Sequence, residues 1–429
     1  MSLILDEQQS SGYTGPGKGQ KQFSSKGAVG GSSTMATIQD DDERLLARIG
    51  YKQELRREFS KWSTVSYAIS ILGVLGSVPA TFGPPLAAGG PATAVWCWFI
   101  GSFMAMCIAS SVAELVSAYP TAGVLASIAI CVSLLVLTPE KQSAKWVFTN
   151  VTNGSGWNSK AFSFLLGFIS VAWTMTDYDG TTHMSEETHD AAIRGPIAIQ
   201  SAILVSGIFG WMLTVTMCFC LSDLDKILDS PTGLPAAQIF LNAGGRTGGT
   251  IMFSFSILVQ FFTGCSAMLA DTRMTYAFAR DDALPFSEFF AKVNPYTLTP
   301  VNAVWFVVFF SICLNCIAIG STQTATAIFN ITAPALDLSY IAVILAHQLY
   351  KNKVRFIEGP FTLGKWGTPL NMISIAWVLF ISVVLFFPPT RPITAENMKY
   401  TGPRTKNMLQ SVETDDIDGP YGTTTGFDA

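Results

Sequence analysis

The chain has 429 residues, of which 49% are hydrophobic and only 13% are charged. Because a soluble domain contains about 25% charged residues, this composition excludes an ordinary soluble protein and predicts a protein embedded in a lipid bilayer. The net charge of −4 carries little information, since the charges are concentrated in tails and loops. We expect no nucleic-acid partner.

The eight cysteines all fall within apolar runs, so they do not form the pattern of a disulfide framework. Cys313-Leu-Asn-Cys316 has the spacing of a metal-binding pair. Helix packing nevertheless explains one such pair at membrane depth better than a metal does. No nucleophile–base set is apparent either, so we expect no metal, no other cofactor and no enzyme activity.

The composition divides the chain into three parts. Residues 1–61 are expected to be a cytosolic N-terminal tail: the first 45 or so are rich in Gly, Ser, Gln and Thr, which is typical of disorder. The last part of this tail, 43–61, has apolar residues at helical spacing with basic residues between them, which suits the cytosolic membrane surface. Residues 62–389 carry the apolar runs of a transmembrane bundle, and residues 390–429 form a polar C-terminal tail.

The first expected span, at about 62–82, is interrupted by small residues and a proline. Gly73, Gly76, Ser77 and Pro79 lie within this apolar run. Proline removes a helix donor, and glycine loosens the backbone. An opened turn of this kind frees N–H groups that can bind an anion such as a carboxylate. A simple kink, which is common in membrane helices, is the alternative interpretation.

A second span is expected at 92–118, but the next apolar run, from Val124 to Leu137, is only 14 residues long. About 20 residues are needed to cross a bilayer, so this run spans marginally, enters and leaves on one side, or is a remnant of a longer span. The loop after it contains two N-glycosylation sequons, at Asn150 and Asn153, which can be used only on the luminal or extracellular side.

Four residues near the middle of the chain form the strongest candidate for half of a substrate site. Asp177, Tyr178, Asp179 and Gly180 lie in the stretch Trp173–His189, which follows the apolar run from Phe162 to Val171. Ionisable groups at membrane depth are costly and face a cavity or a partner. A helix break at Gly180 would free backbone groups that are tolerated only where they line such a cavity. In the alternative interpretation the span ends at Met175 and the carboxylates lie in interfacial water.

Five more spans are expected in the second half, near 197–221, 251–269, 301–319, 325–349 and 370–387. Basic residues gather in every second connection, at 273–292 and 351–355, and the positive-inside rule places both connections on the cytosolic side. Both sequons then lie outside, provided that the short run at 124–137 does cross. Within the span at 325–349, Asp337 either relays protons or caps a helix that restarts after Pro334, and we favour capping.

Several segments of the chain resemble fungal amino-acid, GABA and choline permeases of the amino acid–polyamine–organocation superfamily. The segments that carry this resemblance are Tyr178-Asp179-Gly180-Thr-Thr-His183-Met-Ser-Glu186-Glu187-Thr188, Ile49-Gly-Tyr51-Lys-Gln-Glu-Leu-Arg-Arg-Glu-Phe59, Ala113-Glu-Leu-Val-Ser-Ala-Tyr-Pro-Thr121 and Phe262-Thr-Gly-Cys-Ser-Ala-Met-Leu-Ala-Asp-Thr-Arg273. The resemblance covers residues 43 to 400. It implies an all-α membrane protein with the leucine-transporter-type inverted-repeat bundle, in which broken helices 1 and 6 hold the substrate.

The resemblance places those broken helices at Gly73–Pro79 and at Trp173–Gly180. The substrate-binding candidates are therefore Gly73, Gly76, Ser77, Trp173, Asp177, Tyr178, Asp179 and Gly180. Asp179 and Asp337 are the candidates for proton coupling. We expect the acidic loop at Glu186 and Glu187, flanked by His183 and His189, to be solvated rather than to bind a metal.

The chain departs from the family pattern in length. Members have twelve spans, whereas this sequence predicts about nine, because 119–123 runs directly into the end of span five and a polar tail follows where a twelfth span should begin. Spans three, four and twelve are therefore expected to be absent. The chain is either a secondary transporter, as the resemblance implies by proton symport, or a non-transporting form such as a truncated isoform.

The resemblance implies that the solute is an amino acid, GABA or a related small amine, with choline as the alternative. Choline is considered because Trp173 and Tyr178 flank Asp177, where amino-acid and GABA members have Gly before the Tyr-Asp pair. An extra acid beside aromatic rings favours a cationic head group. The expected location is the plasma membrane, with the vacuolar or another internal membrane as the alternative.

Overall fold

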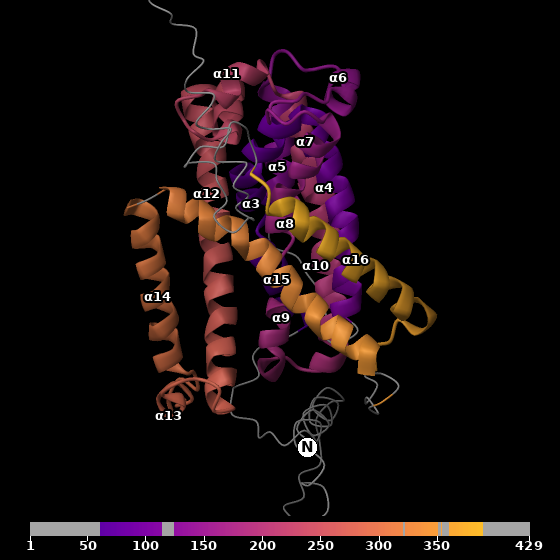
Figure 1. The fold of residues 1–429 in the computed structure, drawn as a ribbon. Coiled ribbons are helices and arrows are strands. Elements are labelled where there is room, and N and C mark those ends of the chain that lie inside the picture. The colour runs from indigo at the N-terminus through magenta and orange to yellow at the C-terminus, as the bar shows by residue number, and fades with distance from the viewer. Residues whose placement is uncertain (1–60, 114–123, 321, 351–352, 354–359, 389–429) are drawn as a thin grey trace, which may run out of the picture.

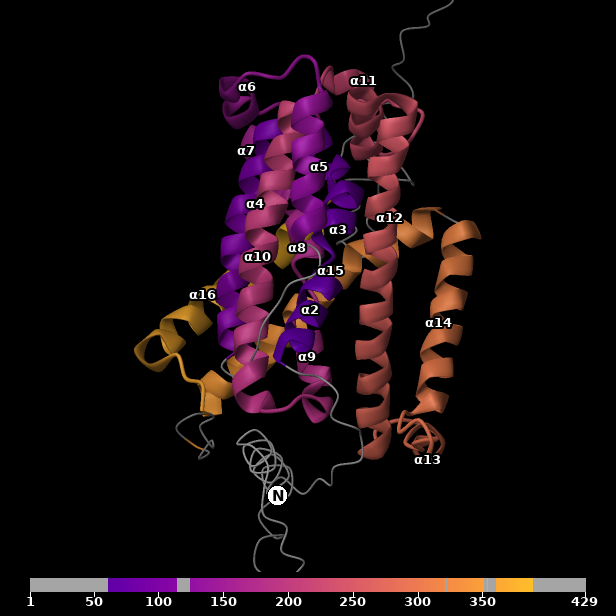
Figure 2. The same cartoon turned by 180° about the vertical axis from the view of Figure 1, so that it is seen from behind.

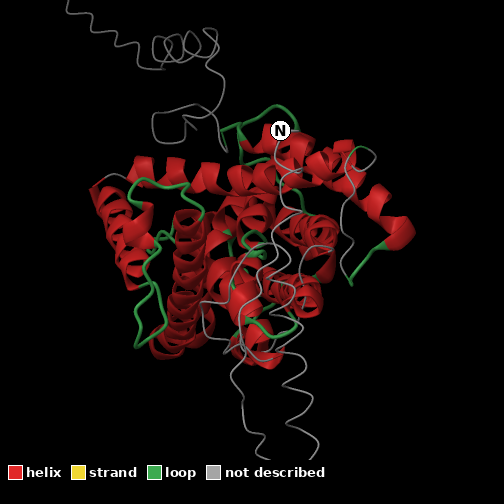
Figure 3. Ribbon diagram, turned by 90° about the horizontal axis from the view of Figure 1, so that it is seen from below, coloured by secondary structure: helices red, strands yellow, loops and turns green. Residues whose placement is uncertain are grey.

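The structure is a computed structural model that describes residues 61–113, 124–320, 322–350, 353 and 360–388. The regular elements in these ranges are all helices (Figure 3). This agrees with the predicted all-α membrane bundle. The predicted N-terminal basic helix, the junction at 119–123 and the polar C-terminal tail lie outside the described residues, apart from Lys61 at the start of the first helix.

The longer helices follow the expected order along the chain. They are α2 (Lys61–Leu72), α3 (Val74–Thr81), α4 (Gly83–Ala113), α5 (Val124–Leu137), α10 (Ala191–Phe219), α12 (Pro235–Arg280), α14 (Val301–Gly320), α15 (Thr322–Tyr350) and α16 (Gly367–Leu385). Short helices and 3-10 turns lie between them: α6 (Ala144–Thr149), α7 (Lys160–Leu166), α8 (Phe168–Thr174), α9 (Gly180–His183), η1 (Ser185–Glu187), α11 (Leu224–Leu228), α13 (Ser287–Phe290) and η2 (Gly364–Trp366).

Six helices within the described ranges are long and apolar enough to cross a membrane, and three shorter apolar helices accompany them at 127–137, 160–174 and 301–317. Each of the nine expected spans coincides with one of these helices. The boundaries differ at two places: α4 begins at Gly83 rather than near residue 92, and α12 is 46 residues long. Both helices contain a glycine with non-helical backbone angles, Gly90 in α4 and Gly245 in α12, so each continues past a kink that an apolar run does not reveal.

The helices form a tightly packed group with a looser hairpin beside it. α4 packs along α10, and α2, α5 and α8 pack against this pair. α12 and α14 lie next to each other at one side of this group, while α15 and α16 run obliquely across it (Figures 1 and 2). The apolar side chains of α12 are largely exposed, as expected for a helix that faces lipid.

The short apolar run at 124–137 forms one uninterrupted helix, α5, which packs against α10 and α12. At 1.5 Å per residue its 14 residues extend about 21 Å. A bilayer core is about 30 Å thick, so α5 has the length of a partial span, and a turn back within this segment is excluded.

The loop that carries the two sequons docks onto the kink in α4. Around Gly90 (φ 76°), the Thr152 N–H donates to the Gly89 carbonyl at 3.0 Å and the Gly154 N–H donates to the Ala88 carbonyl at 3.1 Å. Backbone groups opened by the kink thus find partners in the loop. This loop lies at the same end of the bundle as α6 and α11, whereas α9 and α13 lie at the opposite end (Figure 1). The arrangement supports the predicted opposite sides for the sequons and the basic loop near Arg280.

Candidate functional site

The first membrane helix is broken at Gly73, the first position of the predicted interruption, whereas Gly76, Ser77 and Pro79 lie inside the helix that follows, α3. Gly73 adopts a left-handed conformation (φ 47°, ψ 45°) between α2 and α3. Its carbonyl accepts the N–H groups of Gly76 at 2.8 Å and Ser77 at 2.9 Å, so these two amides are used inside the first turn of α3. The Ser77 hydroxyl donates to the Leu72 carbonyl at 3.2 Å. Val74 and Leu75 then supply the amides that begin α3.

Helix α12 lies directly against this break. A Cβ atom on Gly73 would lie 1.9 Å from Thr263 Oγ1, and one on Gly76 would lie 2.4 Å from Gln260 Oε1. Thr263 also donates to the Ser70 carbonyl at 2.8 Å, which satisfies a backbone group that the break exposes. The two glycines therefore allow α12 to approach the break without a gap.

The second break interrupts the helix that precedes the predicted acidic segment. Helix α8 ends at Thr174, residues 175–179 are not helical, and α9 begins at Gly180. Asp177 has a positive φ of 64°, a conformation that non-glycine residues rarely adopt. The predicted break is confirmed. The helix does end near Met175, as the alternative interpretation had it, but the chain continues inside the bundle and both carboxylates are half-buried.

The two carboxylates at this break have different surroundings. Asp179 accepts a hydrogen bond from the Tyr340 hydroxyl at 2.6 Å, and its other oxygen lies 3.6 Å from His183 Nε2. Asp177 lies within electrostatic reach of Asp179, His183 and Asp271 of α12. Negative charge is therefore concentrated at the break, with one histidine to offset it.

Aromatic rings close the same break from the side of α15. The Tyr178 ring is fully buried and stacks on Tyr340, with 5.1 Å between the ring centroids and 38° between the planes. Trp173 is half-buried in the last turn of α8. The aromatic contact of Tyr178 is thus with α15, and Tyr340 is the aromatic neighbour that the sequence did not point to.

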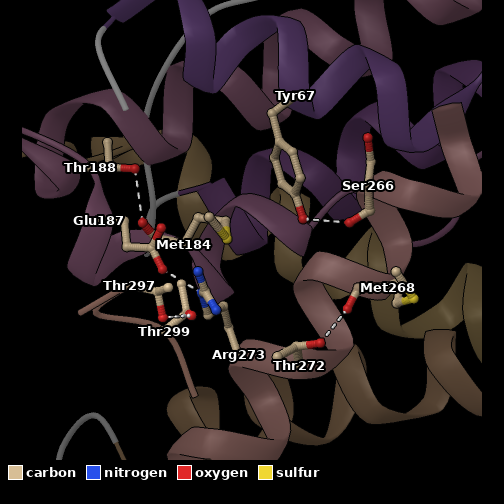
Figure 4. A network of polar contacts seen from close by, with 10 residues as sticks. All are labelled: Tyr67, Met184, Glu187, Thr188, Ser266, Met268, Thr272, Arg273, Thr297 and Thr299. Atoms are coloured by element: carbon tan, nitrogen blue, oxygen red, sulfur yellow. Dashed lines mark hydrogen bonds and ion pairs between the residues drawn. The ribbon is translucent and has the colours of Figure 1, made fainter. Parts of the chain in front are cut away.

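The two breaks lie next to each other. A Cβ on Gly180 would lie 2.5 Å from Ile71 Cδ1 of α2, and the Thr81 hydroxyl of α3 is 2.8 Å from the Ser170 hydroxyl of α8. The Tyr67 hydroxyl of α2 donates to the Ser266 carbonyl of α12 at 2.9 Å (Figure 4). Segments more than 80 residues apart in sequence are therefore brought together around the unwound backbone.

The acidic loop after the second break is tied to α12 by two ion pairs, which corrects the expectation of a solvated loop. Glu187 pairs with Arg273, and both side chains are less than one-tenth exposed (Figure 4). Glu186 pairs with Arg280, two turns further along α12, where about one-fifth of each side chain is exposed. Because the arginines are far from the glutamates in sequence, only the fold pairs them.

Asp337 does not cap a helix. α15 continues through Pro334 without a break, from Thr322 to Tyr350, so the favoured capping role was wrong. Asp337 is instead buried on α15, one turn before Tyr340.

Sequence reasoning missed a polar stripe on α12. Ser256, Gln260 and Thr263 lie at helical spacing inside an apolar helix and on the side that faces the first break. Ser256 Oγ and Gln260 Oε1 are buried and have no hydrogen-bond partner within the described residues. The 4- and 3-residue spacing of these polar residues in an apolar run is the signal that could have identified them.

Residues 123–405 match the family model described as "Amino acid permease". The chain belongs to the amino acid permease family. Members of this family are transporters rather than enzymes, and the apolar helices agree with a multi-pass membrane protein.

Curated relatives cover most of the permease. An uncharacterized amino-acid permease of Schizosaccharomyces pombe is 35% identical, with 87% of each chain covered. The amino-acid permease BAT1 of Arabidopsis thaliana is 30% identical over 87% of this chain and 93% of its own. The GABA-specific permease of Saccharomyces cerevisiae is 26% identical over 84% of this chain and 81% of its own.

Proposed function

We propose that this permease is a secondary transporter that carries an amino acid, GABA or a related small amine by proton symport. The observation that carries the proposal is the pair of helix breaks, at Gly73 and at 175–179, which lie against each other and against α12. Unwound backbone inside a membrane bundle is tolerated where it is buried in protein or lines a cavity. Broken helices of this kind bind solutes in transporters. The similarity to a GABA-specific permease supports the choice of solute.

The two ends of a zwitterionic solute would meet different parts of this site. The amides of Val74 and Leu75 begin α3 and carry the partial positive charge of a helix N-terminus, which suits a carboxylate. The solute's ammonium group would face Asp177 and Asp179 of the second break. The remaining proposed binding residues would line this site: Gly73, Gly76, Ser77, Trp173, Tyr178 and Gly180. Asp179 and Asp337 are the proposed proton-coupling carboxylates.

Uptake of labelled GABA and amino acids by a permease-deficient yeast, with and without a proton gradient, tests the proposal. The variant Gly76→Ala forces a methyl group against Gln260 Oε1 and the α12 backbone, at 2.4 and 3.1 Å, so it should separate α3 from α12 and reduce uptake. Gly264→Ala is the matched control, because nothing lies within 4 Å of its added Cβ. Equal uptake by both variants would contradict the proposed site.

Choline is a second candidate solute. Asp179 and Asp271 both lie within electrostatic reach of Asp177, and Tyr178 stacks on Tyr340 at the same break. A quaternary ammonium group needs negative charge and aromatic faces, and each cation–π contact contributes about 0.5–2 kcal/mol. In a transport-competent chain, Asp177→Asn should weaken choline uptake far more than GABA uptake. An unchanged choline affinity would exclude this candidate.

We also propose that spans three and four are missing at the junction near 119–123. The alignment with the S. pombe relative is 470 positions long, which is more than the 429 residues of this chain. Only 87% of this chain takes part in the alignment, so the alignment contains gaps in this chain. The relative therefore carries residues that this chain lacks, and the family match begins at residue 123, at the proposed junction. This favours a truncated, non-transporting isoform as an alternative function. The absence of span twelve stays a prediction that lies outside the described residues.

The proposed location is the plasma membrane, with the vacuolar or another internal membrane as the alternative. A fluorescent fusion of the full chain in yeast, imaged together with plasma-membrane and vacuolar markers, distinguishes them. Fluorescence confined to an internal membrane would exclude the first location.

A further inference from the structure

A small cavity lies between α4, α8, α15 and α16, next to the second break. Its walls include Ile108, Phe168, Met175 and Trp377, and Asp337 is the one acidic or basic residue among the lining residues. The cavity volume of about 20 Å³ is sufficient for a water molecule, which needs about 10–15 Å³. A single acid therefore faces a water-sized space with apolar and aromatic walls.

The Asp337 carboxyl group has no compensating partner. Its side chain is 7% exposed, and no hydrogen bond or ion pair joins it to any group in the described part of the chain. An ionised carboxylate buried without a partner costs several kcal/mol. Burial without a partner therefore favours the neutral form of this side chain, and a hydrogen-bond donor or a cation that reached the carboxyl group would favour ionisation.

The helices packed closely against α15 do not supply such a cation. Within their bounds, α4, α8, α14 and α16 carry no acidic or basic side chain, and their titratable groups are the thiols of α4 and α14. The other titratable residues of α15 are Tyr340, one turn away, and His347 and Tyr350 in the last turn. From the second break, Tyr178 and Asp179 face this side of α15.

Asp179 differs from Asp337 in this respect. The Tyr340 hydroxyl donates to Asp179 at 2.6 Å, and His183 Nε2 lies 3.6 Å from its other oxygen. Asp179 therefore has two polar partners, whereas Asp337 has none within the described residues. Of the two proton-coupling candidates, only Asp337 has no neighbouring group among these residues that would compensate its charge. Loss or gain of a proton at Asp337 therefore changes the charge inside the bundle without compensation.

The Tyr178 hydroxyl is the donor available to an ionised Asp337. This hydroxyl is fully buried and has no hydrogen-bond partner within the described residues. It lies within electrostatic reach of Asp337, and its ring stacks on Tyr340, which is on the same face of α15. Because Tyr178 belongs to the unwound backbone at 175–179, a movement of the break changes how close its hydroxyl is to the carboxyl group.

We propose that Asp337 takes up and releases the coupling proton, and that Tyr178 links this exchange to the geometry of the second break. On release, the O–H bond of the Asp337 carboxyl group breaks and the proton moves to the cavity water. The carboxylate that remains accepts a hydrogen bond from the Tyr178 hydroxyl. On uptake the proton returns from water and the Tyr178 hydroxyl is freed. The assignment rests on the proposed proton symport, and it makes Asp179 a positioning residue rather than the proton carrier.

Infrared difference spectra of the purified full chain in detergent, recorded as a function of pH, test the assignment without requiring transport. The wild type should show a carboxylic-acid C=O band that Asp337→Asn removes and that Asp225→Asn, an exposed control on α11, leaves unchanged. Tyr178→Phe should move the midpoint of this band to higher pH, because the ionised form loses its donor. Asp179→Asn should leave the band in place.

Two results would overturn the assignment: loss of the titrating band in Asp179→Asn, or its persistence in Asp337→Asn. Uptake measured with and without a proton gradient then separates the two proposals. If Asp337→Asn removes the band but uptake does not depend on the proton gradient, proton symport and the coupling role of Asp337 are both refuted. The conclusion that Asp337 exchanges a proton with water would remain valid. Gradient-dependent uptake that survives in Asp337→Asn would refute the coupling role alone.

Discussion

The buried ion pair between Glu187 and Arg273 gives the sharpest stability prediction. The Glu187→Gln variant leaves the Arg273 guanidinium charged in a position where only 7% of its side chain is exposed. Breaking a buried pair by removing one partner costs about 3–5 kcal/mol, because the remaining charge is uncompensated. We expect the free energy of unfolding to fall by that amount. The double variant Glu187→Leu/Arg273→Met removes both charges and should recover most of the loss.

Denaturant unfolding of the purified chain in mild detergent, followed by tryptophan fluorescence, measures this difference. Glu186→Gln is the matched control, since Glu186 is the neighbouring residue and pairs with Arg280 on the same helix. Its pair is about one-fifth exposed, so the expected cost is smaller, about 1 kcal/mol. Equal losses in the two single variants, or a loss below about 1 kcal/mol for Glu187→Gln, would show that water reaches Arg273 and that the pair is not buried.

Three further outcomes are expected. Asn150 or Asn153 should carry a glycan in yeast, seen as a gel shift that a glycosidase removes. A loop that stays unmodified, and that is protected from protease added outside intact cells, would contradict the predicted orientation. Inserting the two proposed missing spans from a relative at 119–123 should raise uptake, and equal uptake by both chains would show that the gap is harmless. Tyr340→Phe removes the hydrogen bond to Asp179 and should lower uptake at unchanged surface expression, measured with a surface label.

Both helix breaks were predictable because their causes are local. Gly73 can adopt a positive φ at little cost, and the acids at Asp177 and Asp179 are unfavourable inside a continuous membrane helix. The helical segment that precedes the kink at Gly90 was missed, because the second span was expected to begin only at about residue 92, after Pro91. Pro334 led to the opposite error. A proline in a helix interior does not by itself break the helix when neighbouring helices support it, and α15 packs against α14 and α16.

The contacts between distant segments were not predictable, because spacing along the chain carries no information about them. The pairing of Glu187 with Arg273 requires the loop after the second break to lie on α12, and the bond from Tyr340 to Asp179 requires α15 to cross that break. The sequence identified the acids but not their partners. An acid whose partner is unknown is assigned to solvent or to a cap by default, as happened with Glu187 and Asp337.

One helix face connects these observations. Gln260 and Thr263 of α12 lie against the first break, Ala270 lies 3.8 Å from the position of a Cβ on Gly180, and Arg273 holds the loop that follows the second break. Spacings of 3, 7 and 3 residues place all four on one side of a helix. α12 therefore fixes the separation of the two breaks, and neither break can shift along it without losing a hydrogen bond or a buried ion pair. A solute that moves one of the helix breaks has two possible effects. Either the ion pair between Arg273 and Glu187 is lost, or α12 and both helix breaks move together relative to α4 and α10. The Glu187→Gln variant separates these two cases, since it should ease movement in the first and leave it unchanged in the second.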